Sequence, residues 1–289
     1  MSLVRTLIGS GLALGVASSA HASIVANFDG GSGDTQVDQF IGMAGDGWVD
    51  GWNQGFTGNS VTSTQTVQSS NPINGGGNYL NIRNEVTSTP GGNGQTRVGT
   101  SREYADFGAV DLTDTVIYTF DLRVDEATGF TNAFNDTIEL LASTSSTTTN
   151  AGSNSNTSWQ VQFRGNGAIF YRDSTANVNS GATWDVGSVY SFEIVSDAVT
   201  ETYDLSILDD GVSIVDVTGL SWRAAGSLVN EQPQFFAVVP GLFRSSDGAN
   251  LGDVIDVSVD NISIAIPEPA SLALLGLGLG VMALRPKRS

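Results

Sequence analysis

Apolar and polar residues alternate in short runs through most of the chain, and clusters of turn-forming residues separate the runs. In the longest run, 115–124, the apolar side chains recur at every second position: Val116, Tyr118, Phe120, Leu122 and Val124. This period predicts a strand with one apolar face. The opposite face is mostly polar, which is typical of an antiparallel sheet with one solvated side.

The second half of the chain repeats this pattern. Alternating runs at 158–164, 188–196 and 202–208 predict three further strands. The clusters at 165–167 (Gly-Asn-Gly) and 209–211 (Asp-Asp-Gly) predict that tight hairpin turns follow the first and the last of these runs.

Two apolar segments near the end of this region have different patterns. Residues 235–239 are continuously apolar, which predicts a strand buried on both faces. Residues 253–266 alternate instead, and one face of this predicted strand carries Ile255, Val257, Val259 and Asn261.

The body of the chain shows no amphipathic helical pattern of ten or more residues. Short strands separated by polar turns predict an all-β antiparallel sandwich or barrel. The polar segments 84–96 and 143–157 are predicted to be loops between strands.

Composition and charge exclude several functions. Residues 23–266 contain eight arginines and 29 acids (30 in the chain less Glu268), so 8 − 29 gives a net charge of −21. Such a surface repels nucleic acid, which we exclude as a partner. The chain has no cysteine, and its single histidine and single lysine are His21 and Lys287.

Residues 1–22 have the features of a secretory signal peptide. Arg5 precedes a short apolar stretch, and Ala20 and Ala22 fit the small-x-small cleavage pattern. A first transmembrane helix is the alternative, but the apolar stretch is short for one. Cleavage after Ala22 would remove the only histidine, which excludes Ser-His-Asp or Cys-His catalysis and the usual zinc or copper sites. The functions that these residues still permit are catalysis by carboxylates and the binding of calcium through oxygen ligands.

The segments NFDG (27–30), YSFEIVSDAVTETYDLSIL (190–208) and DVSVDNISI (256–264) give residues 24–266 a resemblance to a known family. They look like the concanavalin A-like (laminin G-like) jelly-roll domains of exported bacterial proteins. The resemblance implies an antiparallel jelly-roll β-sandwich over 23–266, with residues 24–28 beside 256–264.

The same resemblance implies a structural calcium ion near the first and last strands. Asp29 and Asp260 are the matching positions. The alternative is that these residues belong to acidic turns without a metal, and the twelve-residue pattern of an EF-hand is absent.

Carboxylate pairs are the first candidates for catalysis, because glycosidases need two acids close together. Jelly-roll glucanases that resemble this architecture carry Glu-x-Asp-x-x-Glu on one strand, and this sequence lacks it. The pairs Glu193 with Asp197 and Asp136 with Glu139 have the wrong spacing, so we interpret them as solvated strand and turn acids. Jelly-roll lyases typically use a histidine as well, whereas the segment 160–172 (QVQFRGNGAIFYR) offers only Arg, Tyr and Gln. We therefore predict that the protein is not an enzyme.

An aromatic, glycine-rich segment at 45–56 is the candidate glycan contact. Trp48 and Trp52 could stack on sugar rings while Asp50 and Asn53 bind hydroxyl groups. The alternative, which the usual burial of tryptophan favours, is that both rings cover the sandwich core.

The end of the chain combines a Pro-Glu-Pro motif, an apolar segment of 15 residues and a basic tail. This order resembles the PEP-CTERM sorting signal of Gram-negative bacteria over residues 267–289. The matching residues are Pro267, Glu268, Pro269, Arg285, Lys287 and Arg288. The resemblance implies a short transmembrane sorting helix, processing by an exosortase, and transient anchoring in the inner membrane before delivery to the cell surface or the exopolysaccharide matrix.

Together these features predict a non-enzymatic exported surface or matrix protein that contacts extracellular polysaccharide. Two alternatives remain open. One is a carbohydrate-active enzyme, either a glycoside hydrolase or a polysaccharide lyase, that uses carboxylates. The other is a protein–protein adhesion module.

Overall fold

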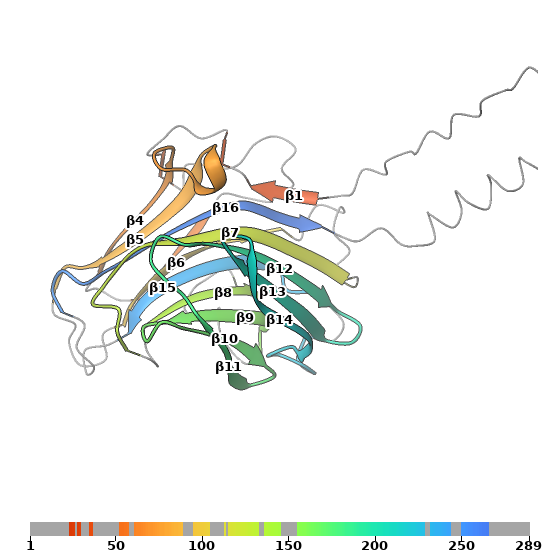
Figure 1. The fold of residues 1–289 in the computed structure, drawn as a ribbon. Coiled ribbons are helices and arrows are strands. Elements are labelled where there is room, and N and C mark those ends of the chain that lie inside the picture. The colour runs from red at the N-terminus through yellow and green to blue at the C-terminus, as the bar shows by residue number, and fades with distance from the viewer. Residues whose placement is uncertain are drawn as a thin grey trace, which may run out of the picture. The chain divides into compact units, whose positions relative to one another are not determined.

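The computed structural model describes residues 23–26, 28–29, 35–36, 52–57, 61–88, 95–104, 113, 115–132, 136–145, 155–228, 232–243 and 250–265. These residues belong to one compact unit, Ala22–Pro267. Most of them lie in antiparallel strands that form two sheets (Figure 1). The fold is an all-β antiparallel sandwich, as the alternating pattern predicts.

The first sheet has nine strands within the described residues. In spatial order, eight of them are β14 (Val212–Ser221), β13 (Thr202–Asp209), β12 (Val189–Asp197), β7 (Thr115–Thr128), β16 (Val254–Ala265), β5 (Tyr79–Val86), β4 (Val61–Gln68) and β2 (Thr35–Gln36). The ninth, β1 (Ser23–Ala26), pairs with β16, so that Ser23 lies opposite Ala265. The predicted pairing of the first and last strands is confirmed, over the shorter stretches 23–26 and 262–265.

The second sheet has seven strands in the same part of the chain. In spatial order they are β11 (Ala176–Thr183), β10 (Ala168–Asp173), β9 (Thr157–Arg164), β8 (Thr137–Ser143), β15 (Phe235–Phe243), β6 (Gln95–Glu103) and β3 (Asn53–Thr57). One short 3-10 turn, η1 (Ile73–Gly75), accompanies the described strands. Since β5 continues to Val86 and β6 begins at Gln95, the loop predicted over 84–96 is shorter than expected.

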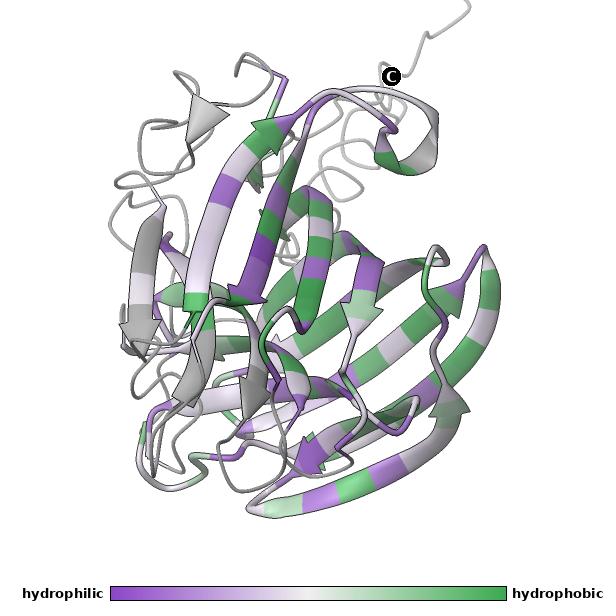
Figure 2. Cartoon of the chain, turned by 90° about the vertical axis from the view of Figure 1, so that its left-hand side faces the viewer, coloured by the Kyte–Doolittle hydropathy of each residue, from purple (hydrophilic) through white to green (hydrophobic). Residues whose placement is uncertain are grey.

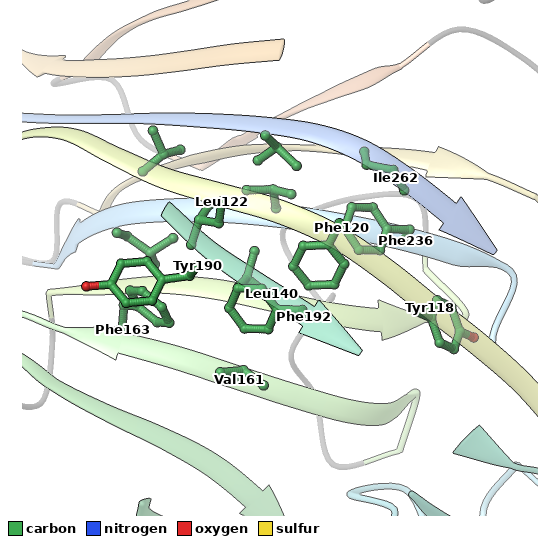
Figure 3. Close-up of a cluster of buried hydrophobic side chains, with 14 of the residues drawn as sticks. Tyr118, Phe120, Leu122, Leu140, Val161, Phe163, Tyr190, Phe192, Phe236 and Ile262 are labelled. Carbon is green, nitrogen blue, oxygen red and sulfur yellow. The ribbon is translucent and has the colours of Figure 1, made fainter. Parts of the chain in front are cut away.

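Aromatic and aliphatic side chains from both sheets fill the space between them (Figure 3). Phe120 of β7 stacks on Phe192 of β12 with ring centroids 4.5 Å apart, and Trp159 of β9 lies 6.3 Å from Phe120 across the core. Along these strands apolar and polar residues alternate in Figure 2. The predicted apolar faces of 115–124, 158–164 and 188–196 are therefore confirmed, and 235–239 is buried on both faces as expected.

The two predicted hairpins are also present. Gly167 ends the β9–β10 turn with φ +79°, and Asp210 and Gly211 form the β13–β14 turn with φ +45° and +83°. Two consecutive residues with positive φ match the twist of the flanking strands, which explains why Asp-Gly occurs there.

The polar face of β7 is less solvated than its sequence predicts. Asp121 and Arg123 are only 8% and 6% exposed. Asp121 accepts hydrogen bonds from Ser191 Oγ (2.6 Å) and Asn261 Nδ2 (2.8 Å), and Arg123 Nε donates to Asp125 Oδ1 (2.6 Å). The outer face of the first sheet is thus a layer of bonded polar groups.

β16 departs from strict alternation at Asn261. This residue has φ +52°, and the register against β7 shifts between Asp260 and Ser263. As a result Val259 and Ile262 both face the core while Asn261 is exposed. The prediction that Asn261 shares a face with Val259 was wrong, because a bulge adds one residue and reverses the alternation.

No helix in the described part of the chain is long and apolar enough to cross a membrane. The predicted signal peptide, with Ala20 and Ala22, and the predicted sorting segment 267–289 lie outside the described residues.

Candidate functional site

The candidate site lies on the outer face of the second sheet, over β8, β9 and β10. Because successive side chains of a strand point to opposite faces, the core residues Trp159, Val161 and Phe163 leave the intervening polar residues of β9 on the outside. A loop after β14 extends the same face, since Arg223 N donates to Ser158 O (2.9 Å). We call this surface the arginine–glutamine face; it comprises Glu139, Ser158, Gln160, Gln162, Arg164, Phe170, Arg172 and Arg223.

One chain of hydrogen bonds crosses the face between β8 and β9. Gln162 Nε2 donates to Glu139 Oε1 (3.2 Å), and Arg164 donates to Gln162 Oε1 through Nε (3.2 Å) and Nη2 (2.7 Å). The guanidinium of Arg164 also lies 3.8 Å from the ring centroid of Phe170 on β10. Glu139, Gln162 and Arg164 are each less than 10% exposed, so they form a rigid floor.

A second group joins β9, β10 and the loop after β14. Gln160 Oε1 accepts from Arg172 Nε (3.3 Å) and from Arg223 Nη1 (2.5 Å). Gln160 is buried, whereas Arg172 and Arg223 are half-buried. These two guanidinium groups are therefore the cations of the face that an external molecule can reach.

The positive charges on this face are partly desolvated. Burial lowers the pKa of Arg164 and of Arg172, and the charge of Arg172 lowers that of Arg164 further. Burial, and then the charge of Arg172, lower the pKa of Arg223 to about 10. Even so, all three groups are protonated at neutral pH, so the face carries concentrated positive charge on an otherwise acidic protein.

The residues predicted from the aromatic segment are not on this face. Trp52 is 2% exposed and packs against Phe28, with ring centroids 5.8 Å apart. Its placement agrees with the alternative that the ring covers the core. Trp48 and Asp50 lie outside the described residues, and Asn53 is described only as the first residue of β3. A glycan contact by this segment stays a prediction.

The charge of Asp29 contributes a little to the raised pKa of Asp260, after burial and the charge of Asp121, so the two predicted calcium ligands are within electrostatic range. Asp260 is 3% exposed, and its Oδ1 has no hydrogen-bond partner among the described residues. However, Asp29 Oδ1 accepts from Asn78 N (3.0 Å), and among the described residues no three acidic, histidine or cysteine side chains gather where they could hold a metal ion. The donor set does not fit a calcium site as it stands, and calcium binding stays a prediction.

The two carboxylate pairs that were predicted to be solvated differ in how exposed their side chains are. Asp136 and Glu139 are 5% and 7% exposed, so the expectation that they are solvated was wrong. Asp136 Oδ2 accepts from Thr131 N (2.8 Å) and Asn132 N (2.7 Å), which holds the turn before β8. Glu193 is exposed, in agreement with the prediction.

The end of the chain is identified by comparison with known families. Residues 265–288 match the PEP-CTERM protein-sorting motif. The chain carries a PEP-CTERM sorting signal. This signal marks an exported protein that an exosortase processes, and it contains the predicted motif residues Pro267, Glu268 and Pro269.

The chain that carries this signal is similar to several solved structures at low sequence identity. The catalytic domain of a glycoside hydrolase family 131 protein from Coprinopsis cinerea has 11% identity and a TM-score of 0.49, over 84% of this chain and 92% of that one. The alginate lyase Aly36B has 11% identity and a TM-score of 0.44, over 86% and 99%.

A sialidase has 10% identity and a TM-score of 0.44, and the match covers 82% of this chain but 19% of the sialidase. No curated protein matches the sequence of the chain. At such identities and TM-scores, these similarities carry no conclusion about what this chain binds or catalyses.

Proposed function

We propose that this exported protein works at the cell surface or in the extracellular matrix as a glycan-contacting module without enzymatic activity. The observation that carries the proposal is the arginine–glutamine face. It exposes part of the guanidinium groups of Arg172 and Arg223 and of the ring of Phe170 above a buried floor of amide groups, and hydrogen bonds between side chains hold the floor in place. Rigid elements that present several polar groups suit the recognition of sugar hydroxyls.

The arrangement of acids supports a binding role over hydrolysis. Glycosidases use two carboxyl groups on either side of the scissile bond. On the outer faces of β8, β9 and β10, Glu139 is the one carboxylate that the described residues provide, and it accepts a hydrogen bond from Gln162. A residue tied in this way maintains the face instead of attacking a substrate.

The proposal is tested by screening the purified full-length protein on an array of polysaccharides. Retention on at least one matrix glycan is expected, and Arg172→Gln should weaken it. Arg83→Gln on the outer face of the first sheet is the control and should not. The same glycans should show no release of reducing ends on incubation with the protein.

Two results would contradict the proposal. Absence of retention on every glycan would remove the glycan contact. Release of reducing ends that Glu139→Gln abolishes would instead establish a carbohydrate-active enzyme.

A further inference from the structure

The two accessible arginines of the arginine–glutamine face meet at one neutral atom. Arg172 and Arg223 come from β10 and from the loop after β14, and both donate to Gln160 Oε1. An amide oxygen orients two guanidinium groups but does not neutralise either of them. The hydrogen bonds to this oxygen therefore hold the two guanidinium groups beside each other in fixed positions.

Arg172 obtains no compensating negative charge from the described part of the protein. Its Nη1 donates to the carbonyl oxygen of Thr175 (2.8 Å), which is neutral. The outer face of the first sheet shows the contrast, because Arg83 lies 2.6 Å from Glu126 and 3.2 Å from Asp256. In a body with 29 acids and eight arginines, an arginine next to a second arginine and without a carboxylate needs an explanation.

The buried floor also lacks an acceptor. Gln160 is fully buried, and its Nε2 has no hydrogen-bond partner among the described residues. A buried amide donor without a partner is costly. The amide is the group on which both arginines converge. Its unused donor needs an oxygen acceptor, and the Arg172 cation beside it favours an acceptor that is negatively charged.

We propose that Arg172 and Arg223 bind the carboxylate of a uronic acid residue, so that the glycan recognised by this face is an acidic one. The inference rests on the glycan contact proposed above and adds the chemical class of the ligand. A carboxylate matches the fork of a guanidinium through two parallel hydrogen bonds.

An acidic peptide offers the same carboxylate, but the surroundings favour a sugar. Protein interfaces bury aromatic and aliphatic anchors at their centres. The large apolar side chains that are exposed in the described residues are single and scattered, and none lies on β8, β9 or β10: Val25, Val186, Val199, Val212 and Leu251. The arginines instead contact an amide oxygen and a backbone carbonyl.

The test compares each uronic acid polymer with its own methyl ester, which removes the charge and keeps the backbone. Full-length protein is run in affinity gels that contain polygalacturonate or hyaluronan, or the esterified form of each. We expect at least one free acid to retard the protein on the order of tenfold more strongly than its ester, about 1.4 kcal/mol. Arg172→Gln and Arg223→Gln should abolish this difference, and Arg172→Lys should restore part of it.

Arg83→Gln is the control and should behave as the wild type, and thermal melts show that each variant is folded. If acid and ester retard the protein equally, or if only neutral glycans on the array retain it, the carboxylate inference is overturned while the glycan contact stands. If no glycan retains the protein, both are overturned. If Arg172→Gln unfolds the protein, the inference is still tested by two measurements. These are the retardation of the wild type by acid and by ester, and the retardation of the Arg172→Lys variant.

Discussion

Asp260 lies at the point in β16 where its neighbour changes from β5 to β1. Its side chain is 3% exposed, and burial raises its pKa to about 7, with smaller contributions from the charges of Asp121 and Asp29. A buried acid among acids favours the protonated form. One residue therefore makes the stability of the sandwich depend on pH near neutrality.

The sign of this dependence can be predicted. Between the ordinary pKa of 3.8 and about 7, the folded state binds more protons at Asp260 than the unfolded state does. This residue therefore lowers the free energy of unfolding as pH rises through that window. Asp260→Asn should remove this effect. The free energy of unfolding of the variant minus that of the wild type should therefore increase from pH 4 to pH 8 by on the order of 2–4 kcal/mol.

Urea unfolding in the presence of a chelator measures the difference at each pH. Asp216→Asn, at an exposed position of β14, is the control. A difference between Asp260→Asn and the wild type that is the same at pH 4 and pH 8 would show that Asp260 has no raised pKa.

At the scale of elements, the strands with regular alternation could be predicted from the sequence because alternation is a local property. β16 also carried a readable signal, since Val257 and Val259 are out of phase by one residue with Ile262 and Ile264. A phase change of this kind indicates a bulge, and Asn tolerates the positive φ that one requires.

The candidate site could be predicted only in part. The sequence 160–172 shows which of its residues share a face, but the contact between Gln160 and Arg223 depends on residues 63 positions apart. A loop that hydrogen-bonds to the end of β9 creates it. No local pattern contains that pairing, and none revealed that Glu139 would be buried.

The bulge in β16 gives a prediction of its own. Asn261→Gly and Asn261→Ala both lose the hydrogen bond to Asp121 (2.8 Å), so they differ mainly in the cost of positive φ. Ala should be less stable than Gly by about 1 kcal/mol, because its Cβ disfavours this conformation.

The same pair of substitutions at Glu193, an exposed position inside β12, should show the opposite order by about 0.5–1 kcal/mol. Both comparisons are made by chemical unfolding. An Ala variant at 261 that is as stable as the Gly variant would mean that the bulge relaxes.

At the scale of the whole molecule, the two outer faces differ in charge. The first sheet pairs its outer arginines with carboxylates, as at Arg83 and Arg123, whereas the second sheet gathers Arg164, Arg172 and Arg223. A net charge of −18 keeps the chain soluble and repels other polyanions at long range. Binding of an acidic glycan must therefore depend on short contacts at the arginine–glutamine face.

The sorting signal predicts how the chain is handled. Deletion of 267–289 should abolish processing of the C-terminus and display at the cell surface, and should leave the thermal melt of the body unchanged. Mass spectrometry of the mature C-terminus and surface labelling measure the first two effects. The control is Pro72→Ala, which alters a proline outside the motif; surface display by the deletion variant would contradict the prediction.

β16 has a consequence for the order in which the protein folds. It is the last described strand, it directly precedes the sorting signal, and yet it lies in the middle of the first sheet, between β7 on one side and β5 and β1 on the other. Before β16 has paired with its neighbours, the strands from β14 to β7 and the strands from β5 to β2 are not hydrogen-bonded to each other. The first sheet therefore becomes continuous only when the strand next to the sorting signal has been added, so the body of the protein completes its fold with its last described strand.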